Sequence, residues 1–258
     1  MRRLCVLAGL LFFSGLACAQ ALGVVMMHGK WGQPPSWTQP VAESAEREGW
    51  TVVQLTMPWA GNRLYDADYD SALAQVAEAV KALRAKGVKR VVVAGHSFGA
   101  NAALAYAGRG GDADGIVAMA PGHNPRRSYE EGVTRDAVDR ARTLVAAGQS
   151  GERIDFVDLN QGKRRSLSTR AEVFLSYFDP DGLGDMPTSV SRIPRPLPLL
   201  WVVGTRDPLY PAGQGYAYDK APAHALSRYV VVDADHVQTP SAGREQIIDW
   251  LRSLAAQP

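Results

Sequence analysis

The residue best placed to perform chemistry is Ser97, the central residue of the pentapeptide GHSFG at positions 95–99. The apolar run Val91–Ala94 precedes it, and the small, helix-forming residues Ala100–Tyr106 follow. The motif therefore falls where a buried strand passes into a helix. A serine on such a tight turn presents its hydroxyl above the sheet edge, and the backbone N–H of Phe98 would point toward a bound carbonyl oxygen. Because the chain holds 25 glycines, this motif alone is a weak signal.

A serine hydroxyl becomes a strong nucleophile only when a base takes its proton and an acid orients that base. At a strand–turn–helix site these partners follow in the order acid, then histidine, each after a later strand. Asp207 follows the apolar run that ends at Val203, and His236 follows the run that ends at Val232. We therefore predict Ser97 as the nucleophile, Asp207 as the orienting acid and His236 as the base.

Other residues compete for the acid and the base. His123 follows the fourth apolar run and is the serious alternative as base, whereas His28 and His96 are expected to be structural and His224 to lie in a surface loop. Two competing acids stand so close to His236 in sequence that pairing with its ring is awkward. These two acids are Asp233 and Asp235. Three further acids, in an insertion described below, are Asp179, Asp181 and Asp185.

An oxyanion that develops during attack needs a second N–H donor from the loop after the first strand. That loop contains HGKWG at positions 28–32, and we predict the backbone N–H of Lys30 as the donor beside Phe98, with Trp31 as the alternative. Some aromatic and cationic residues of nearby loops are candidates for a substrate pocket, although each could equally serve packing or the surface. They are Trp31, Trp59, Arg63, Tyr177 and Phe178.

Apolar runs and helical patterns alternate along the chain, which indicates the framework that positions these residues. Hydrophobic residues make up 46% of the sequence and charged residues 21%, so a packed core is expected. The expected strands are Gly23–Met27, Thr51–Met57, Arg90–Ala94, Gly115–Ala120, Leu197–Val203 and Arg228–Val232. Helical patterns cover residues 40–48, 69–83, 97–105 and 246–254. We predict an α/β fold with a mostly parallel six-stranded sheet and helices on both faces.

One long segment, at about residues 123–196, interrupts this alternation between the fourth and fifth strands. Its charges are dense and mixed. We expect a helix near Arg135–Ala147, a hairpin around Asn160-Gln161-Gly162 and a second helix near Thr169–Tyr177. The segment is predicted to be a cap inserted into the sheet domain.

Taken in order, HGKWG, GHSFG, GTRDP at 204–208 and DADH at 233–236 resemble the α/β-hydrolase fold, specifically a small secreted, esterase-like serine hydrolase. The likeness covers nearly all of the chain after its N-terminal leader, except the cap. It implies a Ser-His-Asp triad, an acyl-enzyme intermediate, a small-molecule acyl substrate with a carboxylic ester, and neither a metal nor an organic cofactor. Larger members carry two strands before the HG-bearing strand, and we expect this chain to lack them.

Residues 1–19 have the features of a secretory signal peptide, with Arg2 and Arg3 before an apolar run and Ala17-Cys18-Ala19 as a cleavage site. We predict a periplasmic or secreted hydrolase domain at residues 20–258, without stable membrane insertion after cleavage. The alternative is a lipid anchor at Cys18. Cleavage would remove both cysteines, Cys5 and Cys18, and lower the formal charge from +2 to 0, which offers no electrostatic argument for nucleic-acid binding.

The reaction itself is less constrained than the site. The same groups also serve thioesterases, amidases and peptidases, and a catalytically silent binding protein on this scaffold is a further alternative. A dinucleotide-binding sheet is disfavoured because the first strand leads into HGKWG and not into G-x-G-x-x-G. The sequence does not predict the oligomeric state.

Overall fold

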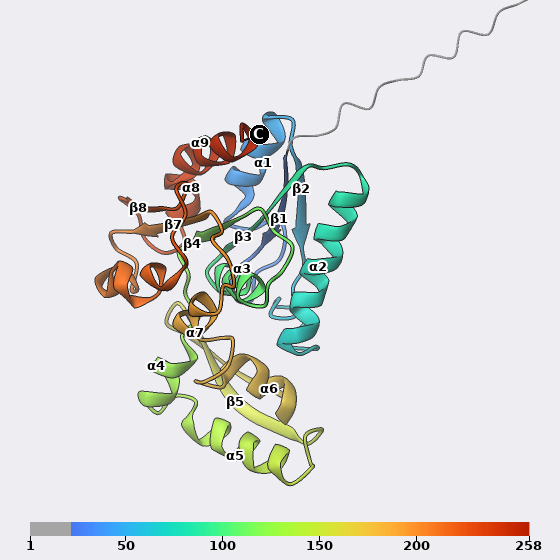
Figure 1. Cartoon of the computed structure of the whole chain (residues 1–258). Helices are drawn as coiled ribbons and strands as arrows, with labels where there is room; N and C mark the ends of the chain where they lie inside the picture. Colours follow the sequence, from blue (N-terminus) through green and yellow to red (C-terminus); the bar gives the residue numbers. More distant parts are fainter. Residues whose placement is uncertain (1–21, 258) are drawn as a thin grey trace, which may run out of the picture.

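The computed structural model describes residues 22–257, so the predicted signal peptide lies outside the described residues. The centre of this part is a six-stranded sheet in the order β2-β1-β3-β4-β7-β8, in which all neighbouring strands are parallel (Figure 1). The strands are β1 (Leu22–Met27), β2 (Thr51–Leu55), β3 (Arg90–His96), β4 (Gly115–Met119), β7 (Leu199–Gly204) and β8 (Arg228–Val232). The predicted α/β fold with a six-stranded parallel sheet is confirmed.

Helices cover both faces of the sheet because neighbouring strand residues point to opposite sides. Val24 and Val92 enter a core shared with α1 and α9, whereas Val25 and Val93 enter a second core shared with α2 and α3. Burial on both sides explains why the central strands are continuous apolar runs without alternation. The helices that follow the strands are α1 (Gln39–Arg47), α2 (Tyr69–Ala85), α3 (Phe98–Gly108), α8 (Thr239–Ala242) and α9 (Arg244–Ala255), and three short 3-10 turns lie at Tyr210–Ala212, Gln214–Tyr216 and Tyr218–Lys220.

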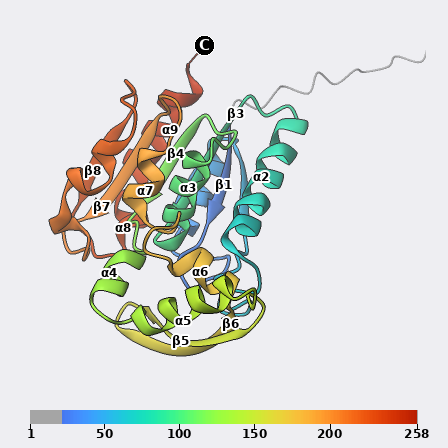
Figure 2. The same cartoon turned by 60° about the horizontal axis from the view of Figure 1, so that its bottom comes forward.

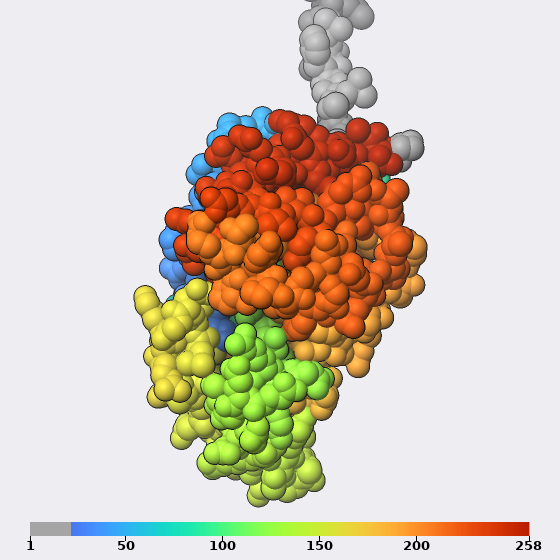
Figure 3. All heavy atoms as spheres, turned by 90° about the vertical axis from the view of Figure 1, so that its left-hand side faces the viewer, coloured from blue at the N-terminus to red at the C-terminus, as the bar shows by residue number. Residues whose placement is uncertain are grey.

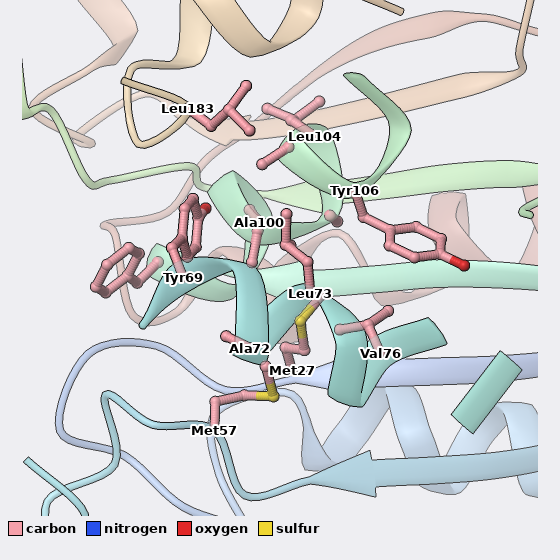
Figure 4. Close-up of a cluster of buried hydrophobic side chains, with 14 of the residues drawn as sticks. Met27, Met57, Tyr69, Ala72, Leu73, Val76, Ala100, Leu104, Tyr106 and Leu183 are labelled. Carbon is pink, nitrogen blue, oxygen red and sulfur yellow. The ribbon is translucent and has the colours of Figure 1, made fainter. Parts of the chain in front are cut away.

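The inserted segment packs on the sheet domain through the core around α2 and α3. Tyr69 and Leu73 of α2 lie close to Leu104 of α3 and to Met27 at the end of β1 (Figure 4). Leu183 of the inserted segment belongs to the same buried cluster. The segment and the sheet therefore share one hydrophobic core on this side.

The inserted segment forms one end of the molecule, below the carboxyl edge of the sheet (Figures 2 and 3). Its antiparallel strands pair from Arg153–Arg170 to Asn160–Lys163, and the hairpin turn is made by Gln161 and Gly162, whose φ angles are 50° and 74°. The positive φ angles suit a two-residue hairpin turn. The elements of the segment are α4 (Pro125–Glu130), α5 (Arg135–Ala146), β5 (Arg153–Asn160), β6 (Lys163–Arg170), α6 (Ala171–Phe178) and α7 (Met186–Ser191). The hairpin, α5 and α6 lie where the sequence predicts them, whereas α4 and α7 were not predicted.

Candidate active site

Ser97 occupies a strained turn between β3 and α3, with a φ of 56° and a ψ of −117°. Such a backbone conformation is costly for a residue with a side chain and is characteristic of functional turns. A Cβ atom at Gly95 would lie 2.2 Å from the carbonyl carbon of Gly99, and one at Gly99 would lie 2.6 Å from the oxygen of Met27. The two glycines of the motif are therefore required by close backbone contacts on either side of the serine.

Three side chains predicted to act together meet at the carboxyl edge of the sheet. His236 Nε2 lies 2.9 Å from Ser97 Oγ, and His236 Nδ1 lies 2.7 Å from Asp207 Oδ2. All three residues are buried. Because a carboxylate accepts, the Nδ1–H group of His236 donates a hydrogen bond to Asp207, which leaves the Nε2 lone pair for the hydroxyl of Ser97. The backbone N–H of Leu209 donates to Asp207 Oδ1 at 2.7 Å and fixes the carboxylate.

His236 is also held through its backbone. His96 Nε2 donates to the carbonyl oxygen of His236 at 2.9 Å, and burial lowers the pKa of His96 to about 4. His96 is therefore neutral near neutral pH and acts as a hydrogen-bond donor to the loop that carries His236. The hydroxyl of Thr239 donates to the carbonyl oxygen of Asp235 at 2.7 Å and closes the same loop.

The other histidines have structural partners. His123 Nε2 donates to the carbonyl oxygen of Tyr177 at 2.8 Å, its ring stacks on Phe98, and burial lowers its pKa to about 3. His28 Nε2 accepts the N–H of Met57 at 3.0 Å, and its burial also lowers its pKa. In the arrangement observed here, His236 alone of the described histidines contacts the hydroxyl of Ser97.

The competing carboxylates are engaged elsewhere. Asp179 and Asp181 accept hydrogen bonds from Arg142 within the inserted segment. Asp233 pairs with Arg206. The remaining two cap short helical turns through the N–H groups that follow them, Asp185 with Thr188 and Asp235 with Gln238. Asp207 is thus the carboxylate that meets His236.

The loop after β1 places the peptide N–H of Lys30 beside Ser97 without a partner among residues 22–257. A Cβ atom at Gly29 would lie 3.1 Å from Ser97 Cβ, so this loop approaches the serine closely. The N–H of Trp31 already donates to the carbonyl oxygen of Trp59 at 2.9 Å. The N–H groups of Lys30 and Phe98 donate to no group of residues 22–257. The geometry therefore favours Lys30 over Trp31 as a donor to a bound oxyanion.

A cavity of about 800 Å³ opens directly at Ser97. Its lining residues include Trp31 and Trp37, and Trp37 is 60% exposed. No aspartate or glutamate is among the described residues that line it. The lining comes from the loop after β1, from the turns that carry Ser97 and His236, and from the tip of the hairpin. The lining residues are Gly29, Lys30, Trp31, Gly32, Gln33, Pro35, Ser36, Trp37, His96, Ser97, Asn160, Gln161, Lys163, His236 and Val237.

Of the predicted pocket residues, the structure places three aromatic ones in the core beside the site and not along this cavity. Trp59 is fully buried and stacks on Phe98 with 4.7 Å between ring centroids. Tyr177 is fully buried and donates its hydroxyl to the carbonyl oxygen of Ala67 at 2.9 Å. Phe178 is buried among other aromatic rings. Their size and position suit packing because the elements they join approach closely here.

The structure places Arg63 outside the cavity as well. Its guanidinium pairs with Asp66 at 3.0 Å and donates to the carbonyl oxygen of Thr56 at 2.7 Å. These contacts satisfy the charge locally, within the loop after β2. Arg63 therefore stabilises its own loop, and Trp31 is the predicted pocket residue that the structure brings to the cavity.

Gly122 and Asn101 belong to the site although sequence reasoning did not single them out. A Cβ atom at Gly122 would lie 2.6 Å from His236 Cε1 and 2.9 Å from Ser97 Oγ. Asn101 of α3 accepts the N–H of Gly122 at 3.2 Å and donates to the carbonyl oxygen of His123 at 2.6 Å. The available signal was a glycine two residues after a predicted strand, at the edge where the other site residues gather.

Within residues 22–257, no group of three or more histidine, cysteine, aspartate or glutamate side chains is arranged to hold a metal ion. None of the helices in this part of the chain is both long and apolar enough to cross a membrane.

Residues 24–249 match the model of a family described as the alpha/beta hydrolase family. Est1E from Butyrivibrio proteoclasticus, solved with ferulic acid, superposes with a TM-score of 0.65 at 16% identity, over 93% of this chain and 91% of that one. A monoacylglycerol lipase from Paleococcus ferrophilus gives 0.65 at 18% identity, over 90% and 94%. A hydrolase of unassigned activity from Agrobacterium vitis S4 gives 0.61 at 17% identity, over 92% and 90%. No curated protein sequence matches the chain.

Proposed function

The chain belongs to the alpha/beta hydrolase family, and from this premise we propose that it is a serine hydrolase that cleaves a carboxylic ester through an acyl-enzyme intermediate. One observation carries the proposal: the continuous hydrogen-bonded chain from Asp207 through His236 to Ser97. A buried carboxylate, an imidazole and a hydroxyl in this order are the groups that acyl transfer requires. The family supports hydrolytic activity in general. That the cleaved bond is a carboxylic ester is our proposal.

In the proposed reaction, Ser97 Oγ attacks the carbonyl carbon of the ester while His236 Nε2 takes the hydroxyl proton. Asp207 stabilises the imidazolium that forms and keeps its ring oriented. The tetrahedral intermediate then collapses, the bond to the alcohol breaks, and His236 returns the proton to the leaving oxygen. Water next attacks the acyl group with His236 again as base, which releases the acid and restores the hydroxyl of Ser97.

The oxyanion of each tetrahedral intermediate would be bound by the backbone N–H groups of Lys30 and Phe98. Both groups lack a partner in residues 22–257, so no existing hydrogen bond has to break. Phe98 is also the first residue of α3, where the helix dipole places partial positive charge. Loss of one such donor typically raises the barrier by about 3 kcal/mol.

The cavity at Ser97 favours a small acyl substrate with an apolar or aromatic part. Two tryptophans, Trp31 and Trp37, are among its lining residues, together with the amide residues Asn160 and Gln161. A cationic substrate would find no carboxylate among the described lining residues to pair with. Neutral or anionic esters are therefore the better candidates.

The test is hydrolysis of p-nitrophenyl esters of graded acyl length and aromatic character, with Ser97→Ala as the control. We expect turnover by the wild type and loss of it in Ser97→Ala. Matched thioesters and anilides are measured in parallel. Turnover of those bonds alone would replace the esterase assignment by a thioesterase or amidase, and a folded protein that turns over none of the substrates would favour a binding protein.

We further propose that the protein is exported after cleavage before Gln20. The basic residues, apolar run and small residues of positions 1–19 support this proposal. Expression with the native N-terminus in a bacterium should give periplasmic or secreted protein that begins at Gln20. A lipid-modified Cys18 at the N-terminus would instead show the anchored form.

A further inference from the structure

A buried carboxylate in the inserted segment joins three parts of the chain around the loop after β1. The side chain of Asp158, on β5, is 1% exposed. Its Oδ1 accepts from Lys30 Nζ at 2.6 Å, and its Oδ2 accepts from Tyr65 Oη at 2.7 Å and from Trp31 Nε1 at 3.0 Å. Both oxygens thus accept hydrogen bonds from groups outside the hairpin.

The position of Asp158 within β5 is unusual for a charged residue. Ile154, Phe156 and Asp158 share the inward face of the strand, and all three are buried. Burying a charge costs several kcal/mol unless it is paired and hydrogen-bonded. An apolar residue would fit the pattern of this face without that cost, so the carboxylate calls for a specific role.

The contacts of the hairpin converge on Lys30, the residue that carries the proposed oxyanion donor, and on the peptide that follows it. Asn160 Nδ2 donates to the carbonyl oxygen of Lys30 at 2.9 Å. Trp31 has a φ of 60°, and its N–H donates to the carbonyl oxygen of Trp59 at 2.9 Å. The side chains of Lys30 and Trp31, the carbonyl of Lys30 and the N–H of Trp31 are therefore all held, while the N–H of Lys30 is free.

We propose that Asp158 is a positioning residue that holds residues 29–32 in the conformation that presents the Lys30 N–H to the oxyanion. This inference rests on the proposed function. Asp158 is not among the cavity-lining residues, so it acts through Lys30 and Trp31 and not on the substrate. Burial and the neighbouring carboxylate of Asp158 raise the pKa of Tyr65, which therefore remains a hydrogen-bond donor. The inserted hairpin is then part of the catalytic framework.

The experiment compares Asp158→Asn with Asp155→Asn, an exposed aspartate two residues earlier on the same strand. The asparagine keeps the shape but presents an NH₂ group to donors. We expect kcat to fall about 30-fold in Asp158→Asn with KM changed less than about threefold, because an oxyanion contact acts mainly in the transition state. Affinity for a trifluoromethyl ketone should fall in parallel. Asp155→Asn should match the wild type in all three quantities.

Tyr65→Phe provides a second, milder test should Asp158→Asn fold poorly. It removes only the hydroxyl that donates to Asp158, and Tyr65 does not line the cavity. We expect kcat to fall about threefold to tenfold, in line with the loss of one hydrogen bond to a charged group. Wild-type kcat in the folded variants, or a loss confined to KM, would overturn the inference.

Amide hydrogen exchange tests the same inference without a substrate. The N–H groups of Trp31 and Gly32 are bonded to Trp59 and Gly29, and both should exchange at least about tenfold faster in Asp158→Asn while β1 is unchanged. Unchanged exchange in this loop would overturn the positioning role even if no substrate has been found. Failure of the proposed function is seen separately, as inactivity of the wild type toward every ester.

Discussion

Two regions surround Ser97, and they are held in place by different means. The sheet edge supplies Asp207 and His236 from loops that directly follow β7 and β8, strands fixed by continuous backbone pairing. The inserted hairpin reaches the site through side chains, chiefly Asp158 and Asn160. The sheet edge thus carries the proposed reacting groups on paired backbone, and the hairpin contacts a neighbouring loop through an ion pair and hydrogen bonds. We expect substitutions at the sheet edge to abolish hydrolysis and substitutions in the hairpin to lower its rate.

Asp207→Asn should produce the largest effect. The amide can hold the imidazole in the wrong tautomer, so kcat is expected to fall by about 10⁴ with little loss of stability. Asp233→Asn is the matched control, since Asp233 lies near His236 in sequence but pairs with Arg206. Steady-state kinetics on the best ester decide the outcome. Comparable losses in the two variants would mean that the carboxylate at 207 has no special role.

Gly122→Ala should produce the next largest loss of activity. The new methyl group would contact His236 Cε1 and Ser97 Oγ at distances that no relaxed structure allows. We expect kcat to fall by about 10² and the free energy of unfolding to fall by about 1–3 kcal/mol, as for other overpacked sites. Gly151→Ala, at a glycine whose added Cβ would meet nothing within 4 Å, separates this clash from a general cost of losing glycine. A fully active Gly122→Ala enzyme would show that the ring of His236 has room to move.

Acidification should destabilise the protein through the buried histidines around the site. The pKa values of His96 and His123 are lowered to about 4 and about 3. Between pH 7 and pH 5 the unfolded chain gains these protons while the folded protein does not, so each histidine should cost about 2 kcal/mol of stability. Urea unfolding at several pH values measures this loss. His123→Gln should reduce the loss of stability between pH 7 and pH 5 by about 2 kcal/mol, and a loss that this substitution leaves unchanged would contradict the lowered pKa of His123.

The smallest effects concern the cavity wall and its surroundings. Trp37→Ala should raise KM by about threefold to tenfold for aromatic esters, because truncation removes an exposed apolar surface worth about 1 kcal/mol. Arg63→Ala should leave kcat/KM within about twofold, since its contacts are local. A large effect of Arg63→Ala with none of Trp37→Ala would mean that Arg63 and not Trp37 contacts the substrate.

The difference between the sheet edge and the hairpin also explains which features of the fold and the site could be predicted from the sequence. Six parallel strands place the residues that follow them at one edge, so the positions of Ser97, Asp207 and His236 could be predicted from apolar runs and chain order. Whether Trp59 faces a cavity or a core depends on how the inserted segment packs, which has no local signature. The sequence held one signal for Asp158. This residue alternates along its strand with the same spacing as the buried residues Ile154 and Phe156, so its carboxylate faces inward. Its partners lie far away along the chain and were beyond sequence reasoning.

The most direct test of the central claim, that Ser97 is activated by His236, is reaction with a fluorophosphonate followed by mass spectrometry of the intact protein and its peptides. We predict one adduct per chain, located on Ser97, formed rapidly by the wild type and at least about 10³-fold more slowly by His236→Ala. A folded wild-type protein that forms no adduct, or one labelled equally fast without His236, would contradict the account.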